Sequence, residues 1–425
     1  MPANTIARKV AIVGYNRIPF ARQFTNYAEA SNTDMMVATL NGLIDKYGLA
    51  GKQMGEVAGG AVIKHSWEIN LMRECVLHTS LDPKTPACDI QQACNTGLES
   101  AMYIANKIAL GQIDCGIAGG VDSTSNVPLY LNEHVRKLLL RARRSKTATE
   151  RISNILKIKL KDFSPEAPAN LEPGTGLSMG GHTEYTAKFY NISREDQDLF
   201  SLKSHQKMAT ATDRGFFNDM VTPFLGLTQD NNMRRDTSLE KLAKLKPAFD
   251  KEHGTLTAGN SSPLTDGASC LLLASEEWAN ANNLPILAYI TYAEMAAIEY
   301  VENKQNLLLA PVYAAPRMLQ KAGLTLQDFD FYEIHEAFAA QVLALLRIWE
   351  SEEWSGAFGV PALGSIDLTK LNVNGSSLAT GHPFAATGGR VIATLAKLLS
   401  EKGSGRGLIS VCAAGGQGMT MILER

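Results

Sequence analysis

The chain has 425 residues and contains 35 glycines, with 45% hydrophobic and 20% charged residues. A chain of this length and composition is too long for one ordinary core, so we expect a globular protein of two or three domains. Lys and Arg number 41 against 43 Asp and Glu, which gives a net charge of −2. This balance excludes a global electrostatic attraction to nucleic acid or to an anionic membrane, and any basic site must be local.

Cysteine usage and the N-terminus indicate the environment of the protein. The six cysteines form no C-x-x-C pair, and no histidines cluster at metal-ligand spacing. We therefore expect no metal site and no disulfide framework, and reduced thiols favour a cytoplasmic location. The apolar run at 10–13 is too short for a signal peptide and predicts a first strand. No stretch reaches the roughly 18 apolar residues of a membrane span, so we expect a soluble protein.

The first part of the chain, residues 9–122, alternates short apolar runs with helical patterns, which predicts an α/β domain. Apolar residues recur at helical spacing over 96–110, so we expect a helix there that ends at Gly111. Residues 113–118 then predict a buried strand that closes on Gly119-Gly120.

Cys94 lies between a strand-like run and the start of this helix. A helix N-terminus stabilises a thiolate through its dipole and its free N–H groups, so we expect a lowered thiol pKa and a nucleophile. A free cysteine is more often an inert buried hydrophobe, which is how we interpret Cys75, Cys115 and Cys270. Cys88 also fits a structural role, although its closeness to Cys94 keeps it under consideration.

Polar, turn-rich sequence over 125–250 predicts an insertion rather than core. Between residues 136 and 161 there are ten Lys or Arg and one acid, Glu150, and four apolar residues share one helical face: Ile152, Ile155, Leu156 and Leu160. This amphipathic helix is either a solvated surface helix or a surface that meets anionic lipid, a partner protein or ligand phosphates.

Two histidines stand out after α/β alternation resumes at Thr255. His335 follows a strand-like run at 331–334 and begins a helix, so it could donate to a developing negative charge or cap the helix. His382 lies between Gly381 and Pro383, where a side chain is poorly placed to fill a core and an imidazole could serve as base to a thiol.

The C-terminal segment repeats the order seen around Cys94. A helix is predicted over 387–399 and a strand over 408–411, and Cys412 then opens a glycine-rich turn at the end of the last strand. Glycines there expose N–H groups that could bind an oxyanion. The repeated order of helix, strand and paired glycines indicates an internally duplicated α/β fold.

Taken together in this order, these segments resemble the thiolase family over essentially the whole chain. The matching segments include Arg17-Ile18-Pro19-Phe20-Ala21-Arg22, Gln92-Ala93-Cys94, Met179-Gly180, Ser193-Arg194-Glu195-Asp196-Gln197-Asp198, Leu245-Lys246-Pro247-Ala248-Phe249, Thr257-Ala258-Gly259-Asn260-Ser261-Ser262, Asp266-Gly267-Ala268, His335-Glu336-Ala337-Phe338, Gly381-His382-Pro383 and Cys412. The resemblance implies two duplicated α/β core halves in a layered αβαβα arrangement plus an inserted loop domain. The implied boundaries are 1–124 with 251–285 for the N-terminal half, 125–250 for the inserted loop domain, and 286–425 for the C-terminal half.

Within the family the resemblance is narrower, to the thiolase (β) subunit of the fatty-acid-oxidation trifunctional complex and its bacterial anaerobic-pathway relative. This subgroup has His at the position of His335, where most thiolases have Asn. It also shares Ser261-Ser262-Pro263-Leu264-Thr265-Asp266 and a basic insertion like 134–163, which the subgroup associates with membrane or partner contact.

The resemblance also implies roles. Cys94 would be the nucleophile that carries the acyl group, His382 its base, and Cys412 the general acid and base. One oxyanion site would use His382 and His335, and a second the backbone N–H groups of Cys94 and Ala414.

The resemblance further implies where coenzyme A binds. Arg234, Ser262, Met179 and Phe338 match residues that contact it or line its tunnel; CoA is a substrate, and no permanently bound cofactor is expected. Ser376-Ser377 departs from the subgroup where a second glycine usually follows Gly375. We expect this difference to change the packing behind His382.

These features favour a 3-ketoacyl-CoA thiolase of fatty-acid β-oxidation, with an acetyl-CoA C-acetyltransferase acting on acetoacetyl-CoA as the alternative. A ketoacyl-carrier-protein synthase or a cysteine hydrolase would have no use for Cys412. A non-catalytic acyl-CoA-binding scaffold subunit is a third hypothesis, which the intact catalytic residues oppose. Family members assemble as homodimers, homotetramers or α2β2 complexes with a hydratase–dehydrogenase subunit, and the sequence leaves these open.

Overall fold

The computed structural model describes residues 7–425, and part of the segment on which the signal-peptide prediction rests lies outside them. The strands are β1 (Val10–Arg17), β2 (Ala21–Arg22), β3 (Val57–Gly59), β4 (Ala87–Asp89), β5 (Cys115–Asp122), β6 (Thr265–Ser275), β7 (Ala288–Ala297), β8 (Phe331–Ile334), β9 (Arg406–Ala413) and β10 (Gln417–Glu424). The helices are α1 (Asn32–Tyr47), α2 (Leu71–Leu77), α3 (Thr96–Ala109), α4 (Glu133–Arg144), α5 (Ala148–Ile155), α6 (Met179–Phe189), α7 (Arg194–Asp213), α8 (Leu239–Ala243), α9 (Glu276–Ala281), α10 (Pro311–Ala322), α11 (Ala339–Glu350), α12 (Glu352–Ala357), α13 (Ser377–Thr380) and α14 (Thr387–Lys402). Three short 3₁₀ helices are η1 (Leu160–Phe163), η2 (Lys304–Asn306) and η3 (Phe384–Ala386).

The strands form one mixed sheet in two parts, of which the first comes from residues 10–275 and the second from residues 288–424. The order is β4-β3-β5-β6-β1-β7-β10-β9-β8, and the two parts join where β1 pairs with β7 over residues 10–12. β3 runs parallel to β4 and β5, and β8 runs parallel to β9, whereas the other pairs along this path are antiparallel. Each part therefore combines parallel and antiparallel pairing.

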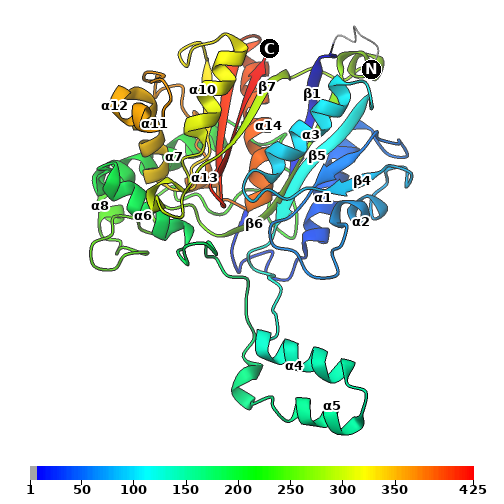
Figure 1. Ribbon diagram of the computed structural model, residues 1–425. Helices are drawn as coiled ribbons and strands as arrows, with labels where there is room; N and C mark the ends of the chain where they lie inside the picture. Colours follow the sequence, from blue (N-terminus) through cyan, green and yellow to red (C-terminus); the bar gives the residue numbers. More distant parts are fainter. Residues whose placement is uncertain (1–6) are drawn as a thin grey trace.

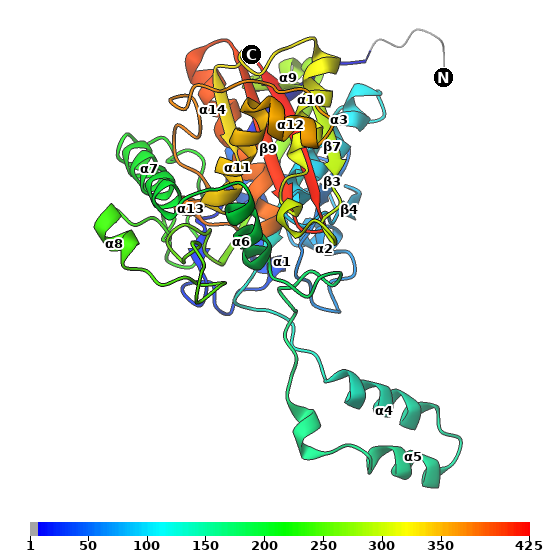
Figure 2. The same cartoon turned by 60° about the vertical axis from the view of Figure 1, so that its left-hand side comes forward.

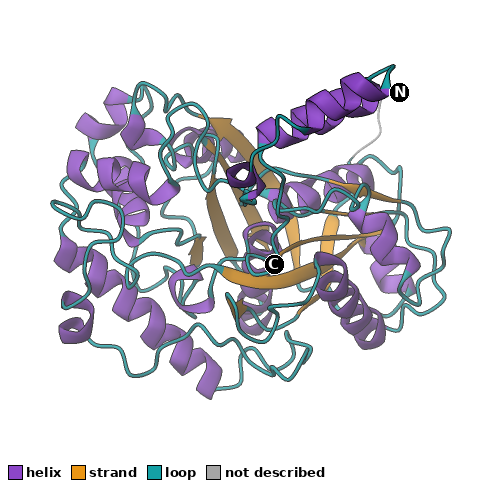
Figure 3. Cartoon of the chain, turned by 90° about the horizontal axis from the view of Figure 1, so that it is seen from below, coloured by secondary structure: helices purple, strands orange, loops and turns teal. Residues whose placement is uncertain are grey.

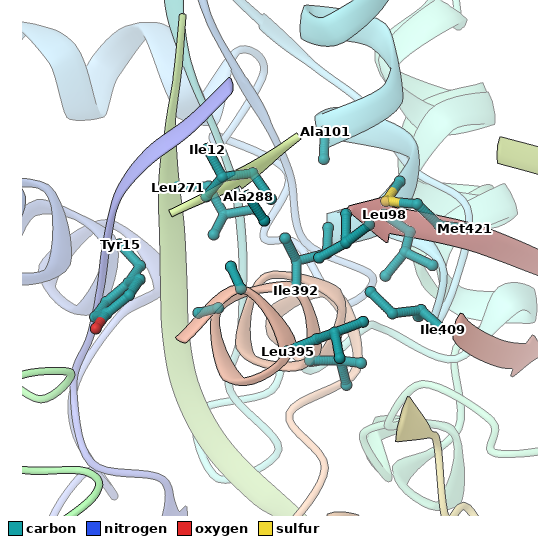
Figure 4. Packing of buried hydrophobic residues seen from close by; sticks show 14 of the residues in the cluster. Ile12, Tyr15, Leu98, Ala101, Leu271, Ala288, Ile392, Leu395, Ile409 and Met421 are labelled. Atoms are coloured by element: carbon teal, nitrogen blue, oxygen red, sulfur yellow. The ribbon is translucent and has the colours of Figure 1, made fainter. Parts of the chain in front are cut away.

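Three hydrophobic clusters show how helices cover this sheet. The middle cluster contains Leu98 of α3 and Ile392 of α14 between Leu271 of β6 and Ile409 of β9, so the two helices lie between the two parts of the sheet (Figure 4). A second cluster packs α1 and α2 against the outer face of the first part, and a third packs α10 and α11 against the outer face of the second. Helices accordingly flank the strands on both sides (Figure 3), and the predicted αβαβα layering is confirmed.

The core elements that periodicity predicts are present, with changes at their ends. The helices predicted over 96–110 and 387–399 are α3 and α14, and the strand predicted over 408–411 is β9. The strand predicted over 113–118 is β5, which begins later, at Cys115, and ends later, at Asp122. Cys412 does not lie in the last strand, because β10 follows it and pairs with β9 as a hairpin.

The basic segment forms an arm that leaves the body of the molecule (Figures 1 and 2). We call residues 129–166 the arm; it contains α4, α5 and η1, and the backbones of Tyr130 and Glu166 pair at its base. The prediction of one amphipathic face is wrong, since Ile152 lies on α5 and Leu160 on η1, and both are exposed. The rest of the predicted insertion packs on the body, where α6 and α7 contact α11. No helix in the described part of the chain is long and apolar enough to cross a membrane.

Candidate active site

Cys94 lies in the tight turn that leads from β4 into α3. Ala93 has a φ of 48°, a left-handed conformation that reverses the chain just before the cysteine. Thr96 holds this turn, because its hydroxyl accepts from the N–H of Gln92 at 2.9 Å and donates to the carbonyl of Ala93 at 2.8 Å. Cys94 is partly exposed, whereas the next residue is buried. The turn therefore holds Cys94 on a fixed backbone just before α3.

His382 faces that sulfur. Its Nε2 lies 3.1 Å from Cys94 Sγ, and its Nδ1 lies 2.6 Å from Oγ1 of Thr387 at the start of α14. The backbone N–H of His382 donates to Thr265 Oγ1 at 3.2 Å. Gly381 has a φ of 100°, and a Cβ there would meet Thr265 Oγ1 at 2.5 Å. Thr387 thus fixes the ring of His382 and Thr265 fixes its backbone, so that Nε2 is directed at the thiol.

Close packing of the two middle helices sets this distance. A Cβ on Gly97 of α3 would lie 2.8 Å from the carbonyl oxygen of Ala385, and one on Gly388 of α14 would lie 2.3 Å from the backbone nitrogen of Leu98. Because each glycine faces backbone, the N-terminal ends of α3 and α14 approach more closely than any side chain permits. Cys94 and His382, which precede these two ends, are brought together as a result.

His335 completes a compact trio. One ring nitrogen of each histidine and the sulfur of Cys94 all lie within 4.8 Å of one another, and the two imidazole rings are 4.1 Å apart. His335 follows β8 and does not cap a helix, since α11 begins at Ala339 with Phe338 as its N-cap residue. Such a trio is also a donor set that a soft cation prefers. The spacing of these three residues along the chain does not indicate that they lie together.

Burial determines the protonation of this group. Desolvation raises the pKa of Cys94 to about 12, even though the N–H groups of Ala414 and of Cys94 itself lower it. The expected lowering of this pKa by the helix N-terminus is therefore wrong for the free protein. Burial, with the charge of Arg390, lowers the pKa of His382 to about 3, and it holds the pKa of His335 well below its usual range. The resting pair is consequently a neutral thiol beside a neutral imidazole.

Cys412 lies near the end of β9 and is buried, and desolvation together with the nearby Cys94 raises its pKa well above the usual range. The turn that follows is anchored by Glu172, which accepts the N–H of Gly415 at 2.8 Å and the hydroxyl of Tyr300 at 2.7 Å. This anchor holds the backbone next to Ala414, whose N–H is directed at the Cys94 sulfur. Sequence reasoning missed Glu172, because a lone acid in a Pro-Gly turn looks like a solvated one.

The residues matched to coenzyme A binding fall into two places. Ser262 donates its N–H to the carbonyl of Ala337 at 3.0 Å, next to Phe338, whose ring meets that of Phe249 at 5.9 Å. Met179 opens α6, and the following glycine admits the Phe249 ring, because a Cβ there would lie 2.2 Å from it. A cavity of about 470 Å³ adjoins this group and is lined by Leu177, Gly181, Glu184, Tyr185, Lys188, Phe249, Asp250, Lys251 and Glu252.

Arg234 lies elsewhere, on the loop before α8, where its N–H donates to Nδ1 of His205 at 3.2 Å. The remaining cysteines lie as predicted for structural residues: Cys75, Cys115 and Cys270 are buried, and Cys88 packs partly buried against the middle cluster. All six thiols are free.

Comparisons with known proteins agree with this arrangement. Residues 10–277 match the family model described as thiolase, N-terminal domain, and residues 284–425 match thiolase, C-terminal domain. The 3-ketoacyl-CoA thiolases of Yersinia pestis (strain Pestoides F) and Yersinia pseudotuberculosis (serotype O:3, strain YPIII) are 39% identical over 424 residues, covering 98% of this chain and 97% of theirs.

Solved structures give the same result. The acetyl-CoA acetyltransferase of Bacillus anthracis superposes with a TM-score of 0.84 at 29% identity, covering 99% of this chain and 100% of that one. Human mitochondrial 3-ketoacyl-CoA thiolase superposes with a TM-score of 0.81 at 28% identity, covering 99% of both chains.

Proposed function

The chain belongs to the thiolase family, and on that premise we propose that it is a 3-ketoacyl-CoA thiolase. It would cleave a 3-ketoacyl-CoA with CoA into acetyl-CoA and a shortened acyl-CoA, as in the β-oxidation of fatty acids. The observation that carries this proposal is the pair formed by Cys94 Sγ and His382 Nε2 at 3.1 Å, with a second free thiol, Cys412, beside it. A nucleophile with an adjacent base and a separate acid is what two successive acyl transfers need.

The first half-reaction begins with a proton transfer. His382 Nε2 takes the proton of the Cys94 thiol as the sulfur attacks the 3-keto carbon of the substrate, because both groups are neutral at rest. The bond between C2 and C3 then breaks, and its electron pair goes to C2. Cys412 protonates this carbon, which releases acetyl-CoA and leaves the acyl group on Cys94.

The second half-reaction runs in the opposite sense. The Cys412 thiolate takes the proton of incoming CoA, and the CoA sulfur attacks the acyl carbon. The bond to Cys94 breaks, and the protonated His382 returns its proton to the leaving sulfur. A neutral His382 and a protonated Cys412 are thereby regenerated, so the cycle balances.

Negative charge develops on oxygen in both half-reactions and needs preorganised donors. His335 and His382 together supply one site, because the centroids of their rings are 4.1 Å apart and both can reach the same oxygen. The N–H groups of Cys94 and Ala414 supply the other, because both already interact with the sulfur. Burial keeps these donors away from competing water.

Coenzyme A would enter along Met179, Ser262 and Phe338, because the ring of Phe338 meets that of Phe249, which lines the 470 Å³ cavity. The pantetheine arm is thin and partly apolar, which suits an aromatic-lined channel. Arg234 would reach the phosphates from the separate loop, as an isolated electrostatic contact.

The test is a chain-length series. Thiolysis of 3-ketoacyl-CoAs with CoA should release acetyl-CoA at several chain lengths, and Cys94→Ala should abolish turnover while CoA binding persists. Turnover confined to acetoacetyl-CoA would support the acetyltransferase alternative, for which the Bacillus anthracis relative is named. Absence of acetyl-CoA release at every length, or CoA binding without turnover in the wild type, would contradict the proposal.

The arm belongs to the same proposal as a site of peripheral membrane contact. Its basic residues accompany apolar side chains that point into solvent, among them Ile152, Leu156 and Leu160, which are 56%, 78% and 90% exposed. Apolar side chains insert between headgroups while Lys and Arg pair with anionic lipid. The whole chain has a net charge of −2, so the arm is a local basic site.

Vesicle co-sedimentation tests the arm. Anionic vesicles should sediment the wild type in a salt-dependent way, and glutamate at Arg141, Arg143 and Arg144 should abolish this, whereas the same change at Lys84 and Lys203 on the body should not. Absence of binding would contradict membrane contact and favour a protein partner for the arm, such as the hydratase–dehydrogenase subunit of an α2β2 complex. Mass photometry distinguishes that assembly from a homodimer or homotetramer, and fractionation tests the cytoplasmic location.

A further inference from the structure

A buried arginine lies behind His335. Arg390 of α14 is 3% exposed, and its Nη2 donates to Ser377 Oγ at 2.8 Å and to Ser376 Oγ at 3.2 Å. Burial lowers the pKa of Arg390, and two buried carboxyls nearby, Glu333 and Glu336, oppose this shift. The serine pair that departs from the usual subgroup pattern therefore packs behind His335.

Ser377 links the arginine to the histidine. Its hydroxyl oxygen lies 2.8 Å from His335 Nδ1, and the residue is fully buried. A guanidinium has donors and no acceptor, so the hydroxyl oxygen must accept from Arg390. The single hydroxyl hydrogen then needs an acceptor, and among the contacts of the described residues His335 Nδ1 is the one within reach.

The opposite assignment is unfavourable. If His335 Nδ1 carried the hydrogen, the Ser377 hydroxyl would accept twice, and its own hydrogen would be buried without a partner between His335 and Arg390. The other tautomer also leaves one hydrogen without a partner in the described part of the protein, but that hydrogen lies in the trio, where a substrate oxygen can accept it. With Nδ1 as acceptor, the hydrogen of the neutral ring must be on Nε2. That nitrogen is buried and has no partner among residues 7–425, and it is the ring atom free to act in the trio with Cys94 and His382.

From this geometry we infer that Ser377 and Arg390 are positioning residues that hold His335 as its Nε2–H tautomer, a fixed donor to the oxyanion. The inference rests on the proposed function for its catalytic meaning, whereas the tautomer itself does not. A neutral ring is required, and the lowered pKa of His335, caused by burial and by the charges of His382 and Arg390, provides it. Donation then costs no reorganisation when the charge develops.

The tautomer is measured directly, without turnover. Nitrogen-15 spectra of the histidine-labelled full-length protein at neutral pH should show His335 with an unprotonated Nδ1 and a protonated Nε2; comparison with His335→Asn assigns the signals. A protonated Nδ1 in the wild type overturns the inference. In Ser377→Ala the assignment should become a mixture of tautomers or reverse, whereas Ser377→Thr, which keeps the hydroxyl, should retain it.

Kinetics separate the positioning role from the proposed function. Ser377→Ala should lower kcat by about ten- to a hundredfold with the KM for CoA within about twofold, since one oxyanion donor is mispositioned. Ser410→Ala is the matched control: its buried hydroxyl has no partner within the described chain, so kcat and the His335 signals should stay unchanged. An active wild type with undiminished kcat in Ser377→Ala refutes the positioning role. An inactive wild type with the stated tautomer refutes the proposed function instead.

Discussion

Replacing Gly388 by alanine tests whether the crossing of α3 and α14 sets the catalytic distance. The new Cβ would lie 2.3 Å from the backbone nitrogen of Leu98, and ordinary contact begins at 3.4 Å. Neither atom belongs to a flexible side chain, so the two helix ends must separate by about 1 Å. Thr387, next to this glycine, holds His382, and the 3.1 Å contact with Cys94 lengthens with it.

A displacement of this size in a catalytic pair costs about a hundredfold in rate, and overpacking costs about 1–3 kcal/mol in the free energy of unfolding. Steady-state thiolysis and denaturant unfolding measure the two effects on Gly388→Ala. The control is Gly356→Ala on α12, where a Cβ has no atom of the described chain within 4 Å, so kcat should not change. Wild-type kcat and stability in Gly388→Ala would refute the argument that close helix packing sets the geometry.

Three further predictions concern the thiol, the CoA channel and the oxyanion turn. Because burial raises the pKa of Cys94, its alkylation by iodoacetamide should rise about tenfold per pH unit between about pH 7 and 9; a plateau below this range, measured by peptide mass spectrometry, would reveal a resting thiolate. Gly180→Ala would displace the Phe249 ring, which lines the 470 Å³ cavity, and should raise the KM for CoA several-fold; an unchanged KM would show that this ring does not contact CoA. Glu172→Ala frees Gly415 and should lower kcat about tenfold at constant KM, whereas a rise in KM alone would assign Glu172 to binding.

The layers of the fold could be predicted from the sequence because their periodicity is strong. α3 buries one face, α14 is buried nearly all round, and β9 is a largely apolar, buried run, so helical and strand patterns are both clear. The arm shows the limit of periodicity: its apolar residues suggest one helix, but Thr147 caps a new one by accepting the N–H of Glu150 at 3.2 Å. That Thr-x-x-Glu pattern is a helix-start signal and could have located the break.

The site could be predicted only in parts. Each of Cys94, His335, His382 and Cys412 has a local signal, yet Cys94 and His382 are 288 positions apart, and their contact follows from the crossing of two helices. The residues that support these four side chains have no such local signal. Arg390 looks like a solvated charge on an amphipathic helix and is in fact buried. Burial also reversed the expected shift in the pKa of Cys94, because desolvation depends on the whole fold and the helix N-terminus only on its neighbours.

The acyl-enzyme is the most direct test of the central claim. Enzyme mixed with a 3-ketoacyl-CoA in the absence of free CoA and quenched in acid should gain the mass of the shortened acyl group, and peptide mapping should place it on Cys94. The same experiment with His382→Ala should slow the gain about a hundredfold or more. An acyl group on Cys412 or Cys88, or acetyl-CoA release with no covalent intermediate, would contradict the account.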